Sequence, residues 1–497
     1  MFPSILWEAA SKENVLPLTS TCNLSCVFCS NRQNPGGVKV YAVAPLPLAL
    51  VKRLIPCLDP RRNIIIGEAA TRINEGEPFT HPSIWQALDA IRERYPQAPL
   101  QITTNGTLLN RPAVQRLAGL GPLSVNLSLN SATPEGRQLL MGDRKPGLAQ
   151  DAARLLGEAG IAFHGSLVAM PHLVGWRDMA ATCRFLQEQG AATVRLFLPG
   201  FTRRAAPSLR FDPLVMHRQL AMFVRRQQEL MTIPLLLEPF LAGGGASLQA
   251  MIAGVLAGSP ADRADLQRGD VIGDVHGRRV RCRVDAFQSV ERFGRPVLNV
   301  KKPDWQGDGR GRGQTGDETR GAANPCLIKR RRRASGLVMN YDLDWGLVEK
   351  VARTIRHHRA SRVLVLTSDW GLPWLQLVMP EWERACDSVH LAAVPSRLFG
   401  GSIAAAGLLT TFDFAAAIRE IRGRVAASGA YPAGSLSRRE SIKMDIISRQ
   451  EWGTVRSGAD YDLLLLPGIA FDRRGRDLIG RHYTCLNHLT KAVIRII

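Results

Sequence analysis

The chain has 497 residues, of which 45% are hydrophobic, and this length and composition fit a soluble multidomain enzyme of roughly three domains. Its nine cysteines, three in one tight cluster and six scattered, exclude the disulfide framework of a small secreted protein and indicate a reducing compartment. The net charge of +21 is compatible with a nucleic-acid partner, but the arginines are spread along the chain, which favours a general compositional bias.

The N-terminus gives no sign of membrane targeting. Residues 1–8 lack a basic region followed by an apolar stretch, and no later run approaches the roughly 18 apolar residues of a membrane span. We therefore expect a cytoplasmic protein without a membrane span.

The first 236 residues alternate short β-rich runs with amphipathic helical segments, a pattern typical of a parallel sheet with crossover helices. In one such segment Ile84, Leu88 and Ile91 are spaced by four and three residues and line one helix face. Six strands are predicted, at residues 15–19, 63–66, 100–103, 124–129, 163–168 and 194–198. The predicted fold class of residues 1–236 is thus α/β, as a partial (β/α)6 barrel.

Polar and thiol side chains follow the first four predicted strands. In barrels of this kind the functional residues lie at the C-terminal ends of the strands and in the loops after them. The candidate site residues in these positions are Cys22, Cys26, Cys29, Gly76, Glu77, Pro78, Asn105, Ser128 and Asn130. We therefore expect the functional site at this end of the barrel.

Cys22, Cys26 and Cys29 lie within eight residues in a C-x3-C-x2-C spacing, with an aromatic residue just before the last cysteine. Three thiolates on a tight loop can hold three irons of a 4Fe-4S cluster and leave the fourth iron without a protein ligand. A zinc knuckle and three incidental buried thiols are the alternatives. Zinc is disfavoured because the nearest later candidates, Cys57 and His81, do not form a second ligand pair.

This loop resembles the cluster-binding loop of the radical S-adenosylmethionine (SAM) enzymes, in which the amino and carboxylate groups of SAM chelate the open iron. The run Gly76-Glu77-Pro78 resembles the Gly-Gly-Glu-Pro motif of that family, which engages the amino group of SAM, although Glu75 replaces the first glycine. A plain loop turn is the alternative for these residues. The resemblance implies two cofactors, a 4Fe-4S cluster and SAM.

Further positions resemble SAM-binding elements of the same family. Asn105 lies in the run TTNG, which resembles the strand-three element, and Ser128 and Asn130 lie in the run NLSLN, which resembles the strand-four element that contacts the ribose. A simple turn and a simple strand end are the alternatives. Phe28 is expected to pack beside the cluster or the adenine, or to serve only as a core anchor.

The family resemblance implies that a reduced cluster passes one electron to SAM, that a sulfur–carbon bond of SAM breaks, and that the resulting 5'-deoxyadenosyl radical abstracts hydrogen from a substrate. The cofactors carry the difficult chemistry, while the protein orients the reactants and excludes water. A reductant such as a ferredoxin or a flavodoxin is the implied partner. Two other functions stay open, namely RNA modification, favoured by the net charge, and non-catalytic iron-sulfur cluster transfer.

Residues 237–303 interrupt the alternation of strands and helices. The runs GSPA at 258–261 and GDVI at 269–272 resemble those of a PDZ domain. Such domains bind an extended peptide as an added strand and hold its terminal carboxylate on backbone amides. This PDZ-like unit therefore either recruits a polypeptide substrate or serves as a spacer at the mouth of the barrel.

Residues 304–336 are rich in Gly and Arg and predict a flexible linker. Residues 337–497 return to an α/β pattern, with apolar strands predicted at 362–366, 389–394 and 462–466. Between the last two, the run FGGSI at 399–403 suits either an anion site on backbone amides or a tight packing turn. The combination of units resembles a family of PDZ-bearing iron-sulfur oxidoreductases whose C-terminal domain has no assigned function.

Overall fold

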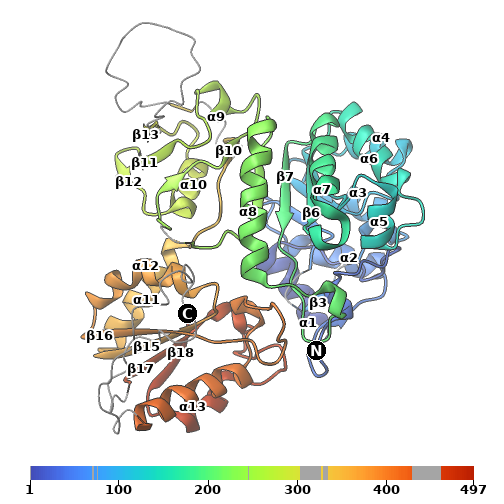
Figure 1. Cartoon of the computed structure of the whole chain (residues 1–497). Coiled ribbons are helices and arrows are strands. Elements are labelled where there is room, and N and C mark those ends of the chain that lie inside the picture. The colour runs from blue at the N-terminus through green and yellow to red at the C-terminus, as the bar shows by residue number, and fades with distance from the viewer. Residues whose placement is uncertain are drawn as a thin grey trace, which may run out of the picture.

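The computed structural model describes residues 2–69, 72–74, 76–243, 246–302, 326–327, 334–427 and 461–497. This part of the chain forms three units (Figure 1): an N-terminal parallel sheet with its helices, a small β-rich unit and a C-terminal α/β unit. Most of the predicted linker at 304–336, as well as Glu75, lies outside the described residues. No helix in these ranges is both long and apolar enough to cross a membrane.

Six parallel strands form the N-terminal sheet and follow one another in chain order. They are β2 (Ile64–Ile66), β4 (Leu100–Thr104), β5 (Leu123–Ser128), β6 (Ala162–Val168), β7 (Thr193–Phe197) and β8 (Leu235–Glu238). Alternate side chains share a face, so Ile102, Val125 and Leu127 join the main apolar core, whereas Thr103 and Asn126 lie on the opposite face, called the inner face below. The α/β class and the parallel sheet are as predicted.

Helices connect these strands (Figure 1): α3 (Ile84–Arg94), α4 (Arg111–Ala118), α5 (Pro134–Met141), α6 (Gly147–Glu158), α7 (Pro171–Glu188) and α8 (Pro213–Leu230), preceded by α1 (Phe2–Glu8) and α2 (Leu48–Leu54). Three of them begin at a side-chain cap, because Asn110, Thr133 and Asp212 each accept a hydrogen bond from a backbone amide of the first turn. Each cap is followed within two residues by a proline, which suits the first helical turn.

The first predicted strand, at residues 15–19, is wrong. Only Val15 forms a bridge to the sheet, opposite Ile65, and the chain then leaves the sheet because Leu18 and Ser20 hydrogen-bond with residues 46 and 43. The sixth strand is instead β8, which sequence reasoning missed. The apolar part of β8 is a run of three leucines that comes shortly after α8. So short a run has no periodicity, and the sequence therefore does not distinguish a strand from a helix there.

The β-rich unit contains a four-stranded antiparallel sheet of β9 (Ala250–Met251), β11 (Val271–Val275), β12 (Arg278–Arg279) and β13 (Leu298–Lys301), with helices α9 (Pro260–Arg263) and α10 (Arg283–Arg292). A separate antiparallel pair joins β10 (Gly254–Val255) to β14 (Leu337–Val338). β14, at the start of the predicted C-terminal unit, thus pairs with a strand of the predicted PDZ-like unit.

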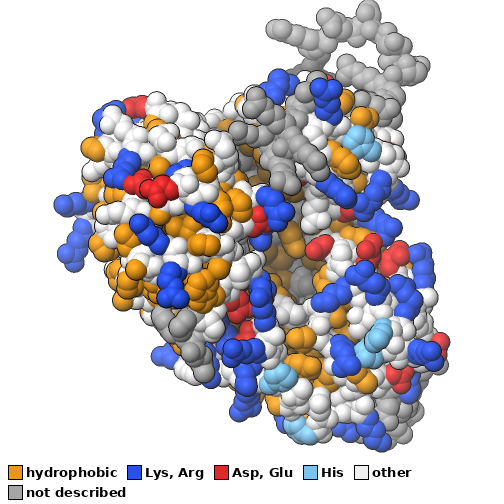
Figure 2. Space-filling model, turned by 180° about the vertical axis from the view of Figure 1, so that it is seen from behind, with side chains coloured by type: hydrophobic (Ala, Val, Ile, Leu, Met, Phe, Trp, Pro, Cys, Tyr) orange, Lys and Arg blue, Asp and Glu red, His pale blue; other side chains and the backbone are white. Residues whose placement is uncertain are grey.

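The C-terminal unit is a parallel sheet in the order β16 (Ser388–Ala393), β15 (Arg362–Thr367), β17 (Leu463–Leu466) and β18 (Val493–Ile496). Its helices are α11 (Trp345–His358), α12 (Leu372–Glu383) and α13 (Thr411–Ala427). The three predicted strands are found, and β18 is an additional one. Figure 2 shows Lys and Arg side chains scattered over all three units on the face in view, in keeping with a general bias toward basic residues.

The C-terminal unit packs on the N-terminal unit beside the cysteine-bearing loop. The backbone N–H of Ser402 donates to the carbonyl oxygen of Phe201, and the Phe201 N–H donates to Ser402 Oγ, both over 2.9 Å. Next to them Thr202 Oγ1 donates to the carbonyl oxygen of Gln33 over 2.6 Å. Gly401 has a φ of +64°, and a Cβ there would collide with the Phe201 carbonyl. The run FGGSI is thus a tight packing turn between units.

Candidate functional site

The three clustered cysteines lie on one loop that hydrogen-bonds to the end of α5. The N–H of Ser25 donates to the carbonyl of Met141 over 3.0 Å, and a turn is closed by the N–H of Cys29 donating to the carbonyl of Cys26 over 3.2 Å. Cys22 is exposed, the other two are partly buried, and none forms a disulfide. The loop therefore presents three free thiols at the C-terminal edge of the sheet.

The thiols of this loop disfavour one another's ionisation. Burial raises the pKa of Cys26 to about 12, helped by the negative charges of Cys22 and Cys29, and burial also raises the pKa of Cys22. A thiolate is the form of cysteine that binds metal. Because neighbouring thiolates repel one another, a cationic group bound between the three sulfurs would stabilise their ionised forms.

The donor set fits a cluster better than a single metal ion. Three cysteine thiols are free on this one loop. In a cubane cluster each thiolate binds a different iron, so the three sulfurs stay apart. The residues present thus fit a 4Fe-4S cluster held by three cysteines, whereas a structural zinc site requires four converging ligands.

Gly76 and Glu77 lie against the start of the cysteine loop. The N–H groups of Gly76 and Glu77 donate to the carbonyls of Thr19 and Thr21 over 2.9 and 2.8 Å. A Cβ at position 76 would collide with the Thr21 carbonyl, so this close approach requires glycine. The loop that follows β2 therefore reaches the cysteine loop despite its length, and Pro78 begins the short 3-10 helix Pro78–Thr80.

The carboxylate of Glu77 is buried, with 3% of the residue exposed. It accepts hydrogen bonds from Thr104 Oγ1 and from the N–H of Asn105, both over 2.7 Å, and from the N–H of Phe79 over 3.2 Å. Burial raises the pKa of Glu77 to about 7, although these hydrogen bonds oppose the shift. Glu77 therefore joins the end of β4 to the loop after β2.

The side chain of Asn105 turns toward the cysteine loop. Its Nδ2 donates to Asn23 Oδ1 over 2.9 Å and lies 3.9 Å from Cys22 Sγ. Its Oδ1 accepts hydrogen bonds from the backbone and side chain of Thr107. The structure thus brings Asn105, Glu77 and Cys22 together, as expected of residues at one end of parallel strands.

Ser128, Asn130 and Phe28 surround this group. Asn130 is held in the left-handed region, with a φ of 63°, and its Oδ1 accepts a hydrogen bond from the N–H of Val168 over 2.8 Å, which ties the end of β5 to β6. Ser128 Oγ accepts a hydrogen bond from Ser166 Oγ over 3.4 Å. Phe28 packs in a small apolar cluster with neighbours that include Cys26 and Met141. All ten candidate residues therefore lie at the same edge of the sheet.

Comparison with known proteins identifies this region. Residues 16–186 match the family model of the radical SAM superfamily. The chain contains a radical SAM domain. The cofactors of such domains are a 4Fe-4S cluster and SAM, so the predicted cofactors are confirmed.

Two curated relatives are similar to part of this chain. Mycofactocin maturase MftC of Mycobacterium ulcerans (strain Agy99) is 28% identical over 183 residues, which are 36% of this chain and 45% of that protein. GTP 3',8-cyclase of Rhodococcus opacus (strain B4) is 30% identical over 181 residues, 34% of this chain and 49% of that protein. The chain thus spans about half the length of these relatives.

Among solved structures, Streptococcus suis SuiB bound to the precursor peptide SuiA is similar to this chain. The match has a TM-score of 0.36 and 20% sequence identity, and it covers 45% of this chain and 48% of SuiB.

A buried arginine of the radical SAM domain was missed by sequence reasoning. Arg137, on α5, donates through Nε to Asp143 Oδ2 over 2.7 Å and through Nη1 to the carbonyl of Leu129 over 2.6 Å. Its Nη2 donates to the carbonyl of Asn105 over 3.3 Å, and its positive charge favours the ionised form of Cys26. An arginine on a short amphipathic helix gives no signal of such a role.

The inner face of the radical SAM domain carries rows of polar side chains, which sequence reasoning also missed. Glu68 Oε1 accepts hydrogen bonds from Thr103 Oγ1 over 2.8 Å and from Asn126 Nδ2 over 3.1 Å. Farther along the sheet His164 Nδ1 and Thr193 Oγ1 lie 2.8 Å apart. A signal was available, because β5 is polar at every second residue, which indicates that one face of this strand meets a polar space.

Proposed function

We propose that this chain is a radical SAM enzyme whose 4Fe-4S cluster is held by Cys22, Cys26 and Cys29. The observation that carries the proposal is the position of these three free thiols on one loop inside the matched domain, where Cys22 Sγ lies 3.9 Å from Asn105 Nδ2. When bound, the cluster supplies the electron that cleaves SAM reductively and so starts hydrogen abstraction from a substrate.

The surrounding residues would then hold SAM. We assign the amino group of SAM to Gly76, Glu77 and Pro78, since the buried Glu77 carboxylate lies beside the cysteine loop. Asn105, Ser128 and Asn130 would contact the remaining polar groups of SAM, including the ribose. Phe28 would form an apolar wall next to the cluster or the adenine.

The substrate we propose is a polypeptide, recruited by the β-rich unit acting as a PDZ domain, and the electron donor is a reductant such as a ferredoxin or a flavodoxin. Support for the PDZ assignment comes from the short antiparallel strands and two helices of this unit. We place the protein in the cytoplasm, because all nine cysteines are free.

Anaerobic reconstitution with iron and sulfide, followed by a strong reductant and SAM, tests this function by the amount of 5'-deoxyadenosine formed. The Cys22→Ala/Cys26→Ala/Cys29→Ala variant is expected to bind no cluster and to form none. A matched control is Cys57→Ala/Cys326→Ala/Cys485→Ala, which removes three free thiols outside the loop and is expected to retain about four irons per chain. A loaded cluster that never cleaves SAM would instead favour cluster transfer.

A further inference from the structure

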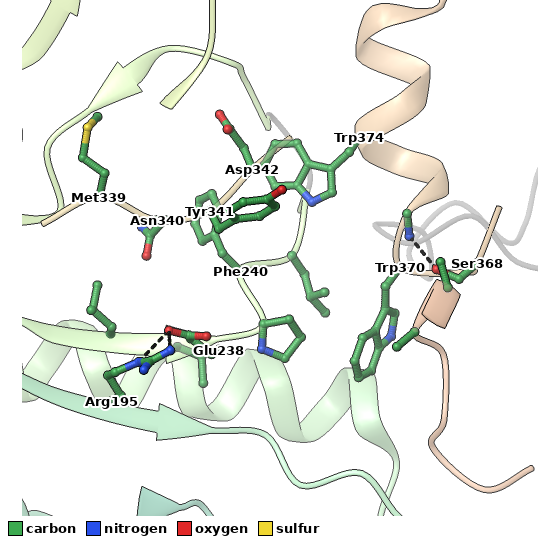
Figure 3. Close-up of a pocket in the computed structure, with 17 residues that line it drawn as sticks. Arg195, Glu238, Phe240, Met339, Asn340, Tyr341, Asp342, Ser368, Trp370 and Trp374 are labelled. Atoms are coloured by element: carbon green, nitrogen blue, oxygen red, sulfur yellow. Dashed lines mark hydrogen bonds and ion pairs between the residues drawn. The ribbon is translucent and has the colours of Figure 1, made fainter. Parts of the chain in front are cut away.

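A cavity of about 500 Å³ lies where the three units meet (Figure 3). Its lining comes from the end of β8, from the connection that follows β14, and from the start of α12. Pockets of this volume at domain junctions commonly bind small groups. The site reaches from the inner face of the radical SAM domain to the surface, so it is placed to receive something that the domain acts on.

One side of the cavity is aromatic. Phe240 and Trp374 pack with their ring centres 5.5 Å apart, and Trp370 of the C-terminal unit packs against the core of the radical SAM domain. Tyr341 lies beside Phe240 and Trp374, opposite the floor formed by Glu238, and is 68% exposed (Figure 3). Arg283 Cζ lies over the Phe240 ring, 5.0 Å from its centre, and Trp374 is buried. The exposed ring of Tyr341 is therefore the one that another aromatic ring can stack on or pack against edge to face.

The floor of the cavity is an ion pair on the inner face of the sheet. Arg195 Nε and Nη2 lie 2.9 and 2.8 Å from Glu238 Oε1, and both side chains are more than a third exposed. Glu238 Oε2 makes no hydrogen bond with the described residues. The pair thus offers both donors and an acceptor, as a peptide group requires.

This floor lies close to the proposed SAM site. The strand register places Ser128 beside Ser166, and Ser166 beside Arg195, in one row across β5, β6 and β7. Two strand spacings separate Ser128 from Arg195, or roughly 10 Å. A group bound in the cavity can therefore extend along the inner face to the place where hydrogen abstraction would occur.

The charges of the lining argue against phosphates. Arg195 is neutralised by Glu238, and the remaining acid, Asp342, is paired with Arg283 at 3.3 Å. No unpaired cation of the described lining faces the cavity. A nucleotide would meet no charge-assisted donors of the kind that phosphates require, whereas an uncharged ring with amide neighbours is well matched.

We infer that this cavity is the substrate pocket and that it binds an aromatic side chain of a polypeptide together with the neighbouring peptide groups. The inference rests on the proposed function and narrows its substrate class. Tyr341 and Trp370 contact the ring, and Arg195 and Glu238 contact the neighbouring peptide groups.

Fluorescence anisotropy of the reconstituted full chain with SAM tests this pocket. The probe is a labelled, capped hexapeptide with one central tryptophan, compared with the same peptide carrying alanine there, and with N-acetyl-tryptophan amide and GTP as competitors. We expect the alanine peptide, and the tryptophan peptide with the Tyr341→Ala or Arg195→Met variant, to bind about five-fold or more weakly. Phe412→Ala, which removes an exposed ring on α13, is the matched control and is expected to change nothing.

Equal binding of both peptides, or unchanged binding in both pocket variants, would overturn the inference. Competition by GTP would overturn the argument from charge, and N-acetyl-tryptophan amide binding as tightly as the peptide would overturn the assignment of a polypeptide as the ligand. Deoxyadenosine formation in the same preparation separates the two proposals. SAM cleavage without tryptophan-dependent binding would refute only the assignment of the substrate pocket. Tryptophan-dependent binding without SAM cleavage would refute only the proposed radical SAM activity.

Discussion

Arg137 and Asp143 form an ion pair beneath the cysteine loop, in which Nε and Oδ2 are 2.7 Å apart and the arginine side chain is 0% exposed. Burial lowers the pKa of Arg137, and Asp143 opposes that shift. Since the same guanidinium also donates to the carbonyls of Asn105 and Leu129, one buried cation joins the ends of β4 and β5 next to Cys26. Fold stability and the electrostatics of the proposed cluster therefore depend on the same side chain.

Replacing Arg137 with methionine leaves the Asp143 carboxylate buried without its partner. We expect the unfolding free energy to fall by about 3–5 kcal/mol, as when other buried pairs lose one member. We also expect a more negative midpoint potential of the reconstituted cluster, because a nearby positive charge favours the reduced form. Thermal unfolding and a redox titration followed by electron paramagnetic resonance measure the two effects.

Arg92 provides the matched control, since it donates to the carbonyls of Leu120, Ala98 and Pro122 at the opposite edge of the sheet. Arg92→Met is expected to lower stability but to leave the midpoint potential unchanged. Arg137→Lys, which keeps the charge, is expected to keep the potential near that of the unchanged protein. An unaltered potential in Arg137→Met would refute the electrostatic role.

The raised pKa of Glu77 predicts that the unfolding free energy of the metal-free protein depends on pH. Its folded pKa of about 7 lies above the ordinary value of 4.5, so the folded state binds a proton more tightly than the unfolded state. Stability from this group is fully present below pH 4.5 and is lost as the pH rises through 7, by about 3 kcal/mol in total. Denaturant unfolding at several pH values should show this decline.

In the Glu77→Gln variant the unfolding free energy should decline less between pH 4.5 and 7, because the glutamine side chain does not titrate. Glu158→Gln, a change at an exposed glutamate on α6, is the control and should keep it. If Glu77→Gln and the unchanged protein show the same slope between pH 4.5 and 7, another group is responsible.

The sequence predicts the site edge well because parallel strands place their C-terminal ends together. Cys22, Glu77 and Asn105 follow three different predicted strands, and the structure brings them into one group through Glu77 and the Asn105 side chain. The same argument failed for residues 15–19, since pairing with residues 43 and 46 competes with the sheet there. Local pattern does not reveal such competition.

No comparable sequence pattern predicts the cavity between the three units or the burial of Arg137. Arg195, Tyr341 and Trp370 come from three units, so their meeting depends on how the units pack and not on any periodicity. Arg137 lies on a short helix where an arginine is usually solvated, and its partner Asp143 lies beyond the helix end. Positions of this kind follow from tertiary contacts alone.

Gly76 is expected to tolerate no side chain. In Gly76→Ala the new Cβ would collide with the carbonyl of Thr21, which forces the cysteine loop away from Glu77. We expect the reconstituted variant to hold well under half of the roughly four irons of a full cluster. Gly36→Ala is the control, since a Cβ there has nothing within 4 Å and the residue follows the same loop. Equal iron content in both variants would contradict the prediction.

Gly401 tests whether the C-terminal unit supports the cysteine loop. A Cβ at Gly401 would collide with the carbonyl of Phe201, and the next residue, Thr202, hydrogen-bonds to Gln33 just beyond Cys29. Gly401→Ala should therefore raise amide hydrogen exchange in residues 30–39 several-fold, because local opening becomes easier when contacts are lost. Gly407→Ala, where the nearest atom lies 3.5 Å away, should leave exchange unchanged. Faster exchange only in the C-terminal unit would mean that the cysteine loop holds its conformation without this contact.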